Sequence, residues 1–415
     1  MSYIKQNICC GHKLKRSGLL NFSEKRILLT GADGFLGHHL QKSFLSQGAK
    51  IFGLSRNKKP RNPVSHPNNT IIIGDILYSD NIHDALKISE PDIIIHLAAQ
   101  SHVGASFLDP VQTCEINCRG TTNLLETIQG SKYDPQIIFP GSADEYGLVI
   151  SSQTQYDNIL AENKKVFPNP TRIPEVPVSE ENPLRPVSPY GISKVYGDFM
   201  MRSYHNSYGM KNIVIRSFNI EGQGRGENFV TSTLARQIIE FKRGQVSSIQ
   251  IGNVAVFRDF THVSDAVAGY CSVIDRGQYG EVYNLGSMRA TSILTYLLHS
   301  IEAAGYSVLS LSSYNNSFYC KDPLILKDYE LFGVRGEYSK IDRLIANNLS
   351  LFSLGSGGIN VLTDKGTIPI SIDPERFRPS DNPFIIADIK KIKNLGYFPR
   401  MSIQEVCRDI VCSYE

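Results

Sequence analysis

The sequence has little excess of charge and no long apolar run. Its 43 lysines and arginines and 40 acidic residues leave a formal net charge of +3 without a basic stripe, so we expect no binding of nucleic acid. No apolar run reaches the roughly 18 residues that a membrane-spanning helix needs. Residues 1–24 are basic and polar and lack the apolar core of a secretion signal. We interpret them as an N-terminal extension of a cytoplasmic protein, with a transit peptide as the alternative.

Metal-site patterns are also missing. The eight cysteines are scattered along the 415 residues. Cys114 and Cys118 have a suggestive spacing, but no second pair of cysteines or histidines lies nearby to complete a zinc site. We therefore expect reduced thiols, as in proteins of reducing compartments, and no bound metal.

Short apolar runs alternate with segments of helical spacing through the first half of the chain. The runs lie at 25–30, 50–54, 70–74, 92–97, 136–140 and 211–216, and helical patterns lie between them at 110–130 and 189–208. Strands that alternate with helices predict an α/β fold, in which helices cover both faces of a Rossmann-type, doubly wound parallel sheet.

The pattern predicts two lobes. Residues 25–216 form the dinucleotide-binding domain, and residues 217–415, where the alternation loosens, form a smaller α/β lobe that closes over a substrate. Two stretches fit neither lobe. Residues 148–180, rich in Asn, Pro, Gln and Ser, are expected to be a surface excursion, and residues 305–368, rich in Ser, Asn, Gly and Tyr, an insertion.

A glycine-rich turn follows the first predicted strand. Gly31 permits a tight turn, Gly34 lets the backbone approach a pyrophosphate, and Gly37 allows the helix to pack closely on the sheet. The start of that helix offers free N–H groups and partial positive charge to phosphates. We expect the whole turn to bind a dinucleotide, including Asp33, Phe35 and Leu36.

The ends of the next strands indicate which dinucleotide binds. The second strand ends at Ser55 and is followed by Arg56, with no carboxylate at hand, which favours the 2′-phosphate of NADP and leaves NAD as the alternative. One strand later, Asp75 stands where it can bond the adenine amino group, next to Ile76. Small residues that can lie beside the cofactor follow the fourth strand, at Leu97, Ala98 and Ala99.

The candidate reactive groups lie at two places. Tyr190 and Lys194 are four apart in a helical pattern, so both project from one face, and a nearby ammonium is expected to lower the pKa of the phenol. Ser142 ends the fifth strand, and Asp144 follows two residues later, where a carboxylate can exchange a proton. For the next residue, Glu145, a structural role is the favoured interpretation.

Together these motifs resemble a known family. The glycine turn, His96-Leu97-Ala98-Ala99, the strand ending in Ser142 and Tyr190-x-x-x-Lys194 occur in the order of the extended short-chain dehydrogenases/reductases, the NAD-dependent epimerases and dehydratases. The resemblance covers about residues 25–300 and 369–415. It is greatest to the GDP-mannose 4,6-dehydratases and the GDP-4-keto-6-deoxy-mannose reductases.

The resemblance implies an NADP-dependent enzyme that acts on a sugar carried by a nucleoside diphosphate, with a GDP-sugar favoured. It implies that Tyr190 exchanges the proton at the sugar 4-oxygen, that Lys194 lowers the tyrosine pKa, and that Ser142 bonds the same oxygen. Asp144 falls where the dehydratases carry a glutamate that removes the C5 proton, and is one carbon shorter. Substrate contacts are implied for Ser101, Asn219, Arg225, Arg258 and Arg378.

We therefore expect a GDP-hexose 4,6-dehydratase. A 4-keto reductase or a 4-epimerase built from the same residues is the alternative, and a non-catalytic dinucleotide sensor is a third hypothesis. Because related enzymes pair two helices of each subunit, the helical segments 110–130 and 189–208 predict a homodimer or homotetramer.

Overall fold

Seven parallel strands form the main sheet. The computed structural model describes residues 22–58, 62–314, 318–347, 357–377 and 382–415, and the sheet has the order β11-β6-β5-β4-β1-β2-β3. The strands are β1 (Arg26–Thr30), β2 (Lys50–Ser55), β3 (Asn69–Ile73), β4 (Ile93–His96), β5 (Gln136–Ser142), β6 (Lys211–Ser217) and β11 (Val282–Leu285). The order reverses between β1 and β4, which is where ligands bind in open α/β sheets. The predicted Rossmann-type sheet is confirmed.

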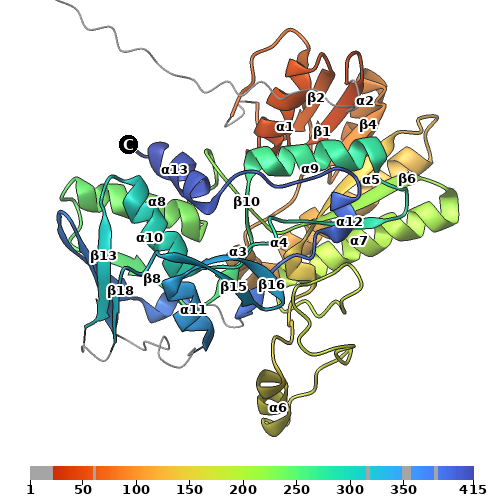
Figure 1. The fold of residues 1–415 in the computed structure, drawn as a ribbon. Helices are drawn as coiled ribbons and strands as arrows, with labels where there is room; N and C mark the ends of the chain where they lie inside the picture. Colours follow the sequence, from red (N-terminus) through yellow and green to blue (C-terminus); the bar gives the residue numbers. More distant parts are fainter. Residues whose placement is uncertain (1–21, 59–61, 315–317, 348–356, 378–381) are drawn as a thin grey trace, which may run out of the picture.

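Helices cover both faces of this sheet (Figure 1). Helices α1 (Phe35–Ser46) and α9 (Val263–Arg276) pack together on one face, and α2 (Ser79–Ser89), α5 (Gly120–Gln129) and α7 (Pro189–Tyr208) pack on the other. Strand side chains alternate between the two faces. In β1, Ile27 and Leu29 belong to the same buried cluster as Phe44 of α1, whereas Leu28 belongs to the cluster of Met201 of α7.

The predicted helix at 110–130 is interrupted. It consists of α4 (Pro110–Cys114), a π-helical turn at Glu115–Arg119, and α5. The turn directs Asn117 inward, where its amide oxygen accepts a bond from Gln100 N (2.8 Å) and its amide nitrogen donates to Ser193 Oγ (2.8 Å). Helical periodicity does not reveal such a turn, because the apolar spacing continues through it.

The second lobe contains a group of packed helices and several small sheets (Figure 1). Helices α8 (Val230–Lys242), α10 (Ile293–Ala303) and α13 (Ile403–Cys412) pack on one another. A five-stranded sheet has the order β14-β13-β17-β18-β8, in which β8 (Ile249–Ile251) pairs with β18 (Gly366–Ile372). The predicted division at 216/217 stays a prediction; β11, which follows it in the chain, lies in the first sheet.

The segment at 305–368 is built into the second lobe. It supplies β13 (Val308–Ser313), β14 (Tyr319–Lys321), β15 (Leu326–Leu331), β16 (Val334–Ser339), α11 (Lys340–Asn347), β17 (Gly358–Thr363) and the start of β18. Strands β13, β14 and β17 extend the five-stranded sheet, and β15 and β16 form a separate hairpin. At the hairpin turn, Phe332 packs against Phe257 and Phe384, with ring centroids 5.3 and 4.0 Å away.

The segment at 148–180 projects from the molecule. It carries α6 (Gln153–Ala161), which has no buried residue and lies at the far end of long loops (Figure 1). Its base is fixed, since Val178 exchanges backbone hydrogen bonds of 2.7 Å with Ile386 and Asp388. Within the described parts of the chain, no helix has the length and apolar character needed to cross a bilayer. Most of the predicted N-terminal extension, residues 1–21, lies outside those parts.

Candidate active site

A single cavity collects the predicted site residues. It has a volume of about 510 Å³ and lies at the carboxyl ends of the main-sheet strands, with the second lobe as its other wall. Arg378 lies outside the described residues. The other predicted residues all line the cavity: Gly31, Asp33, Gly34, Phe35, Leu36, Gly37, Arg56, Asp75, Ile76, Leu97, Ala98, Ala99, Ser101, Ser142, Asp144, Tyr190, Lys194, Asn219, Arg225 and Arg258.

The glycine turn fits a pyrophosphate. Gly31 has a φ of +68°, and a Cβ there would lie 2.8 Å from the backbone nitrogen of Ala98. A Cβ at Gly37 would lie 2.8 Å from the carbonyl oxygens of Gly31 and Ala32, so only glycine lets α1 start this close to the sheet. The first turn of α1 has no capping side chain and no acidic residue. Its N–H groups and dipole therefore remain available to an anion.

A buried hydrogen-bond chain holds the strand ends beneath this turn. Thr30 Oγ1 lies 2.8 Å from His96 Nδ1 and accepts a bond of 3.1 Å from Ala98 N. Burial and, to a smaller extent, the Lys194 ammonium together lower the pKa of His96 to about 3, so the imidazole is neutral. The polar residues at the ends of β1 and β4 thus place Ala98 against the glycine turn.

Polar side chains surround the position expected for the adenosine ribose. Arg56 is exposed, and its guanidinium lies 4.0 Å from the carboxylate of Asp75. Asn57 donates a hydrogen bond of 2.9 Å to the Asp33 carboxylate. The sequence did not single out Asn57, although it also lines the cavity. Its position directly after Arg56 at a strand end is the only signal that marks it.

Tyr190 and Lys194 enter the cavity from the first two turns of α7. Ser188 caps this helix by accepting a bond of 3.0 Å from Gly191 N, and Pro189 occupies the first helical position. The ammonium of Lys194 donates to the carbonyl oxygen of Pro140 (2.8 Å). Ser188 lines the cavity but was not predicted, although Ser-Pro is a recognisable helix start.

The expected lowering of the Tyr190 pKa by Lys194 is wrong for this arrangement. Burial raises the pKa of the phenol, and the Asp144 carboxylate raises it further, while a hydrogen bond with Ser142 opposes the rise. The lysine nitrogen lies 5.9 Å from the centroid of the tyrosine ring. Because a buried phenolate loses its hydration, desolvation outweighs the field of an ammonium at that distance.

Ser142 and Asp144 form a tight turn at the end of β5. Ser142 Oγ lies 3.4 Å from the Asp144 carboxylate and accepts a bond of 3.1 Å from Asp144 N. Glu145 points away from the cavity, where it accepts a bond of 2.7 Å from Ser142 N and pairs with Arg216 at 3.1 Å. Burial and the Asp198 carboxylate raise the pKa of Glu145. Its structural interpretation agrees with these contacts.

The second lobe contributes cations and an aromatic ring. The Arg225 guanidinium lies 3.6 Å from the centroid of the Phe229 ring, and its Nε is 3.6 Å from the Glu221 carboxylate. Arg258 donates from Nη1 to the carbonyl oxygens of Phe257 (2.9 Å) and Asn382 (2.7 Å). Phe229 and Asn382 also line the cavity, and neither has a sequence signal that marks it.

Comparison with known proteins decides the family. The sequence profile of the NAD dependent epimerase/dehydratase family matches residues 27–286. The chain belongs to this family. Members named for their activity are similar over most of their length. The GDP-6-deoxy-D-mannose reductase of Pseudomonas aeruginosa is 29% identical over 320 residues, which cover 76% of this chain and 90% of the relative. The GDP-mannose 4,6-dehydratase of Yersinia enterocolitica is 25% identical over 401 residues, 93% of each chain.

Solved structures of the epimerase/dehydratase family share the fold. The RMD protein of Pseudomonas aeruginosa, solved with NADPH, has a TM-score of 0.65 at 22% identity and covers 94% of this chain and 99% of that chain. The UDP-glucose 4-epimerase of Thermotoga maritima, solved with UDP-glucose, has a TM-score of 0.62 at 22% identity, with 94% and 98% covered. At this identity the likeness concerns the architecture.

Proposed function

We propose that this member of the epimerase/dehydratase family is an NADP-dependent GDP-hexose 4,6-dehydratase. One observation carries the proposal: Ser142, Asp144, Tyr190 and Lys194 face the same cavity as a glycine turn that fits a pyrophosphate. In this proposal residues 25–216 bind the dinucleotide and residues 217–415 bind the nucleotide sugar. The relatives named for GDP-6-deoxy-D-mannose and for GDP-mannose support the choice of substrate.

NADP is proposed because of the charge at the ribose position. Arg56 is an exposed cation at the end of β2, within 4.0 Å of Asp75, and it lines the cavity. A guanidinium there suits a 2′-phosphate, which it can bind with two hydrogen bonds. When bound, the dinucleotide supplies the hydride acceptor and donor of the reaction.

The side chains have distinct proposed roles. Tyr190 takes the proton from the 4-hydroxyl of the sugar as C4 is oxidised, and Ser142 bonds the same oxygen. Asp144, two residues further, removes the proton at C5, which the neighbouring 4-keto group makes acidic, and water leaves from C6. Lys194 orients the ribose next to Tyr190. Arg225 and Arg258 face the cavity from the second lobe and are proposed to bind the diphosphate.

A 4-keto reductase is the second candidate, and the shorter side chain at the dehydratase base position favours it. Asp144 reaches one carbon less far than a glutamate would, and reduction needs no base at C5. A 4-epimerase needs the same Tyr190 and Ser142. A sensor without catalysis has no use for this set of side chains, so we rank it last.

The products of a panel of nucleotide sugars test these candidates. The purified protein is incubated with GDP-mannose, other GDP-sugars and UDP-sugars, and separately with NADPH and a GDP-4-keto-6-deoxy sugar. The masses of the products are measured by mass spectrometry. Loss of one water indicates dehydration, gain of two hydrogens indicates reduction, and unchanged mass with altered chromatography indicates epimerisation. Absence of product from every sugar would contradict an enzymatic function.

We also propose that the protein is at least a homodimer. Ile192, Tyr196 and Phe199 are exposed on one face of α7, at a spacing of four and three residues. Leu108 and Val111 are exposed on the helices that pack beside α7. Exposed apolar side chains gathered on neighbouring helices are typical of a subunit interface.

A further inference from the structure

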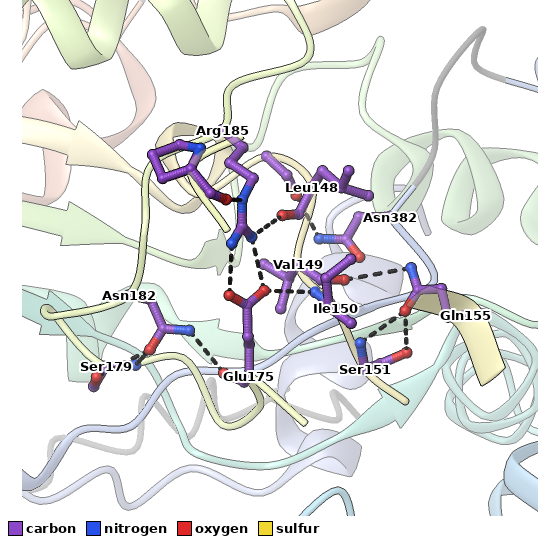
Figure 2. Close-up of polar contacts among 12 residues, drawn as sticks. Leu148, Val149, Ile150, Ser151, Gln155, Glu175, Ser179, Asn182, Arg185 and Asn382 are labelled. Carbon is purple, nitrogen blue, oxygen red and sulfur yellow. Dashed lines mark hydrogen bonds and ion pairs between the residues drawn. The ribbon is translucent and has the colours of Figure 1, made fainter. Parts of the chain in front are cut away.

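A buried arginine joins the projecting segment to the cavity wall. Arg185 is buried, and its guanidinium uses all three of its nitrogens (Figure 2). Nε donates to Pro168 O (2.6 Å), Nη1 donates to Leu148 O (2.9 Å), and Nη1 and Nη2 both bond the Glu175 carboxylate at 2.8 Å. The ion pair is therefore bidentate, and its geometry leaves little freedom to either side chain.

Glu175 holds the two ends of the projecting segment together. Its carboxylate also accepts a bond from Ile150 N (2.7 Å), and its own backbone N–H donates to Ile150 O (2.7 Å). Asn182 donates to the carbonyl oxygen of Glu175 (2.8 Å) (Figure 2). The two ends of the segment 151–174 therefore lie side by side, and the Glu175–Arg185 ion pair holds them there.

The backbone at Arg185 packs closely against the turn at Gly147. Arg185 N donates to Tyr146 O (3.2 Å), and Leu148 N donates to Arg185 O (2.9 Å). Gly147 has a φ of +51°, and a Cβ there would lie 1.9 Å from Arg185 O. From the second lobe, Asn382 donates to Gly147 O (2.6 Å). Three separate segments therefore meet at this turn.

This junction connects the two groups of reactive side chains. Gly147 follows Ser142 and Asp144 within five residues, and Arg185 precedes the Ser188 cap of α7 by three residues and Tyr190 by five. Gly147, Ser188 and Asn382 line the cavity themselves. We therefore expect a shift of the turn relative to Arg185 to change the distance between Ser142 and Tyr190.

We propose that Arg185 is a positioning residue for the reaction: held by Glu175, its guanidinium fixes the Gly147–Leu148 turn against the start of α7 and so keeps Ser142 and Asp144 in register with Tyr190. This inference rests on the proposed function for its catalytic consequence, but not for the geometry it describes. A buried ion pair adds little stability compared with apolar side chains of similar volume. Its directional bonds to Leu148 and Ile150 instead specify one arrangement of the wall.

The test separates position from stability. In R185M and R185K the forked contact is lost, so we expect kcat to fall at least tenfold, while the KM for the sugar and the Kd for NADPH change less than threefold. In R185M, hydrogen exchange should become faster in peptides covering Ser142–Ile150 and stay unchanged in those covering Gly31–Gly37. The double variant E175L/R185M, which leaves no unpaired buried charge, should melt at a higher temperature than E175L alone and still show the low kcat.

The matched control is R335M, which removes an exposed Arg335–Asp328 ion pair of the β15–β16 hairpin and should leave every measured quantity unchanged. A kcat of R185K within threefold of the wild type would overturn the inference. The inference would also be overturned if both kcat and the melting temperature recovered in E175L/R185M, because the ion pair would then contribute only to stability. If no sugar is turned over by the wild type, the proposed function fails instead, and the exchange data alone decide: unchanged uptake at Ser142–Ile150 in R185M then rejects the role of Arg185.

Discussion

The ammonium nitrogen of Lys194 donates to the carbonyl oxygen of Pro140 at 2.8 Å and lies 5.9 Å from the centroid of the Tyr190 ring. The lysine is therefore placed by the backbone of β5 and not by a carboxylate. Burial lowers its pKa to about 8, against the opposing field of Glu145. Lys194 is therefore partly neutral at mildly alkaline pH, and small changes of pH in that range alter its charge.

The buried lysine makes stability depend on pH in a defined window. Below pH 8 Lys194 is protonated in both folded and unfolded chains, and the folded state bears the full cost of a buried charge. Between about 8 and the ordinary value of 10.5, the unfolded chain binds more protons, so wild-type stability rises with pH. K194M has no such contribution. We therefore expect urea unfolding at several pH values to show that the free energy of unfolding of the wild type increases relative to that of K194M across this window.

An exposed lysine provides the control for that measurement. K87M changes an exposed lysine of α2, and its free energy of unfolding should differ from that of the wild type by the same amount at every pH. A difference between K194M and wild type that stays constant from pH 7 to pH 10.5 would show that Lys194 titrates normally in the folded protein.

The sequence was sufficient for the cofactor half of the candidate site because its signals are local. Gly37 is required by contacts within one strand–turn–helix unit, the positive φ of Gly31 belongs to the same turn, and the spacing of Tyr190 and Lys194 follows from one helical turn. The strand end at Ser142 is likewise visible from a single apolar run. Such features do not depend on which distant segment packs beside them.

The remaining features depend on long-range pairing and were not predictable. Glu175 and Arg185 form their pair only because residues 151–174 loop out and return. Phe332 reaches the aromatic cluster of Phe257 and Phe384 through an insertion whose composition indicates no strands. The pKa of Tyr190 was predicted with the wrong sign, because a sequence shows the neighbouring charge of Lys194 but not the depth of burial.

Removing the phenolic hydroxyl tests the assigned proton exchange. Y190F should reduce kcat by about 10²–10⁴-fold, the usual contribution of a general acid or base. The Kd for NADPH should change less than threefold, because the ring and its packing remain. Y208F, at the exposed end of the same helix, is the control and should retain full activity. Activity of Y190F within tenfold of the wild type would require a different proton carrier.

Arg56 should determine the choice of dinucleotide. R56A removes a charged hydrogen-bond donor to the 2′-phosphate, worth about 1.5–3 kcal/mol, so the Kd for NADPH should rise roughly tenfold or more while the Kd for NADH changes less than twofold. Fluorescence titration of both dinucleotides measures this, with K87A as a control for general loss of surface charge. An equal rise of the Kd for NADPH and for NADH would indicate that Arg56 does not contact the 2′-phosphate.

Asp144 separates dehydration from reduction. In D144N, turnover of a GDP-hexose to the dehydrated product should fall by about 10²–10⁴-fold, and incorporation of solvent deuterium at C5 should disappear. Because the Asp144 carboxylate raises the pKa of Tyr190, the residual activity should also rise at a lower pH than in the wild type. Unchanged dehydration by D144N would assign the C5 proton to another group, whereas unchanged ketone reduction would support the second candidate function.

Phe199 tests the proposed subunit interface. Its ring is 53% exposed on α7, on the same face as Ile192, which is 57% exposed. Burying a glutamate without a partner at such a contact is costly, so F199E should dissociate the assembly into monomers, measured by size-exclusion chromatography with light scattering. F398E changes a similarly exposed ring, 60% exposed, between α12 (Lys390–Lys393) and α13 and should leave the molar mass unchanged. An F199E protein with the molar mass of the wild-type assembly would place the interface elsewhere, and a wild type that is itself monomeric would remove it.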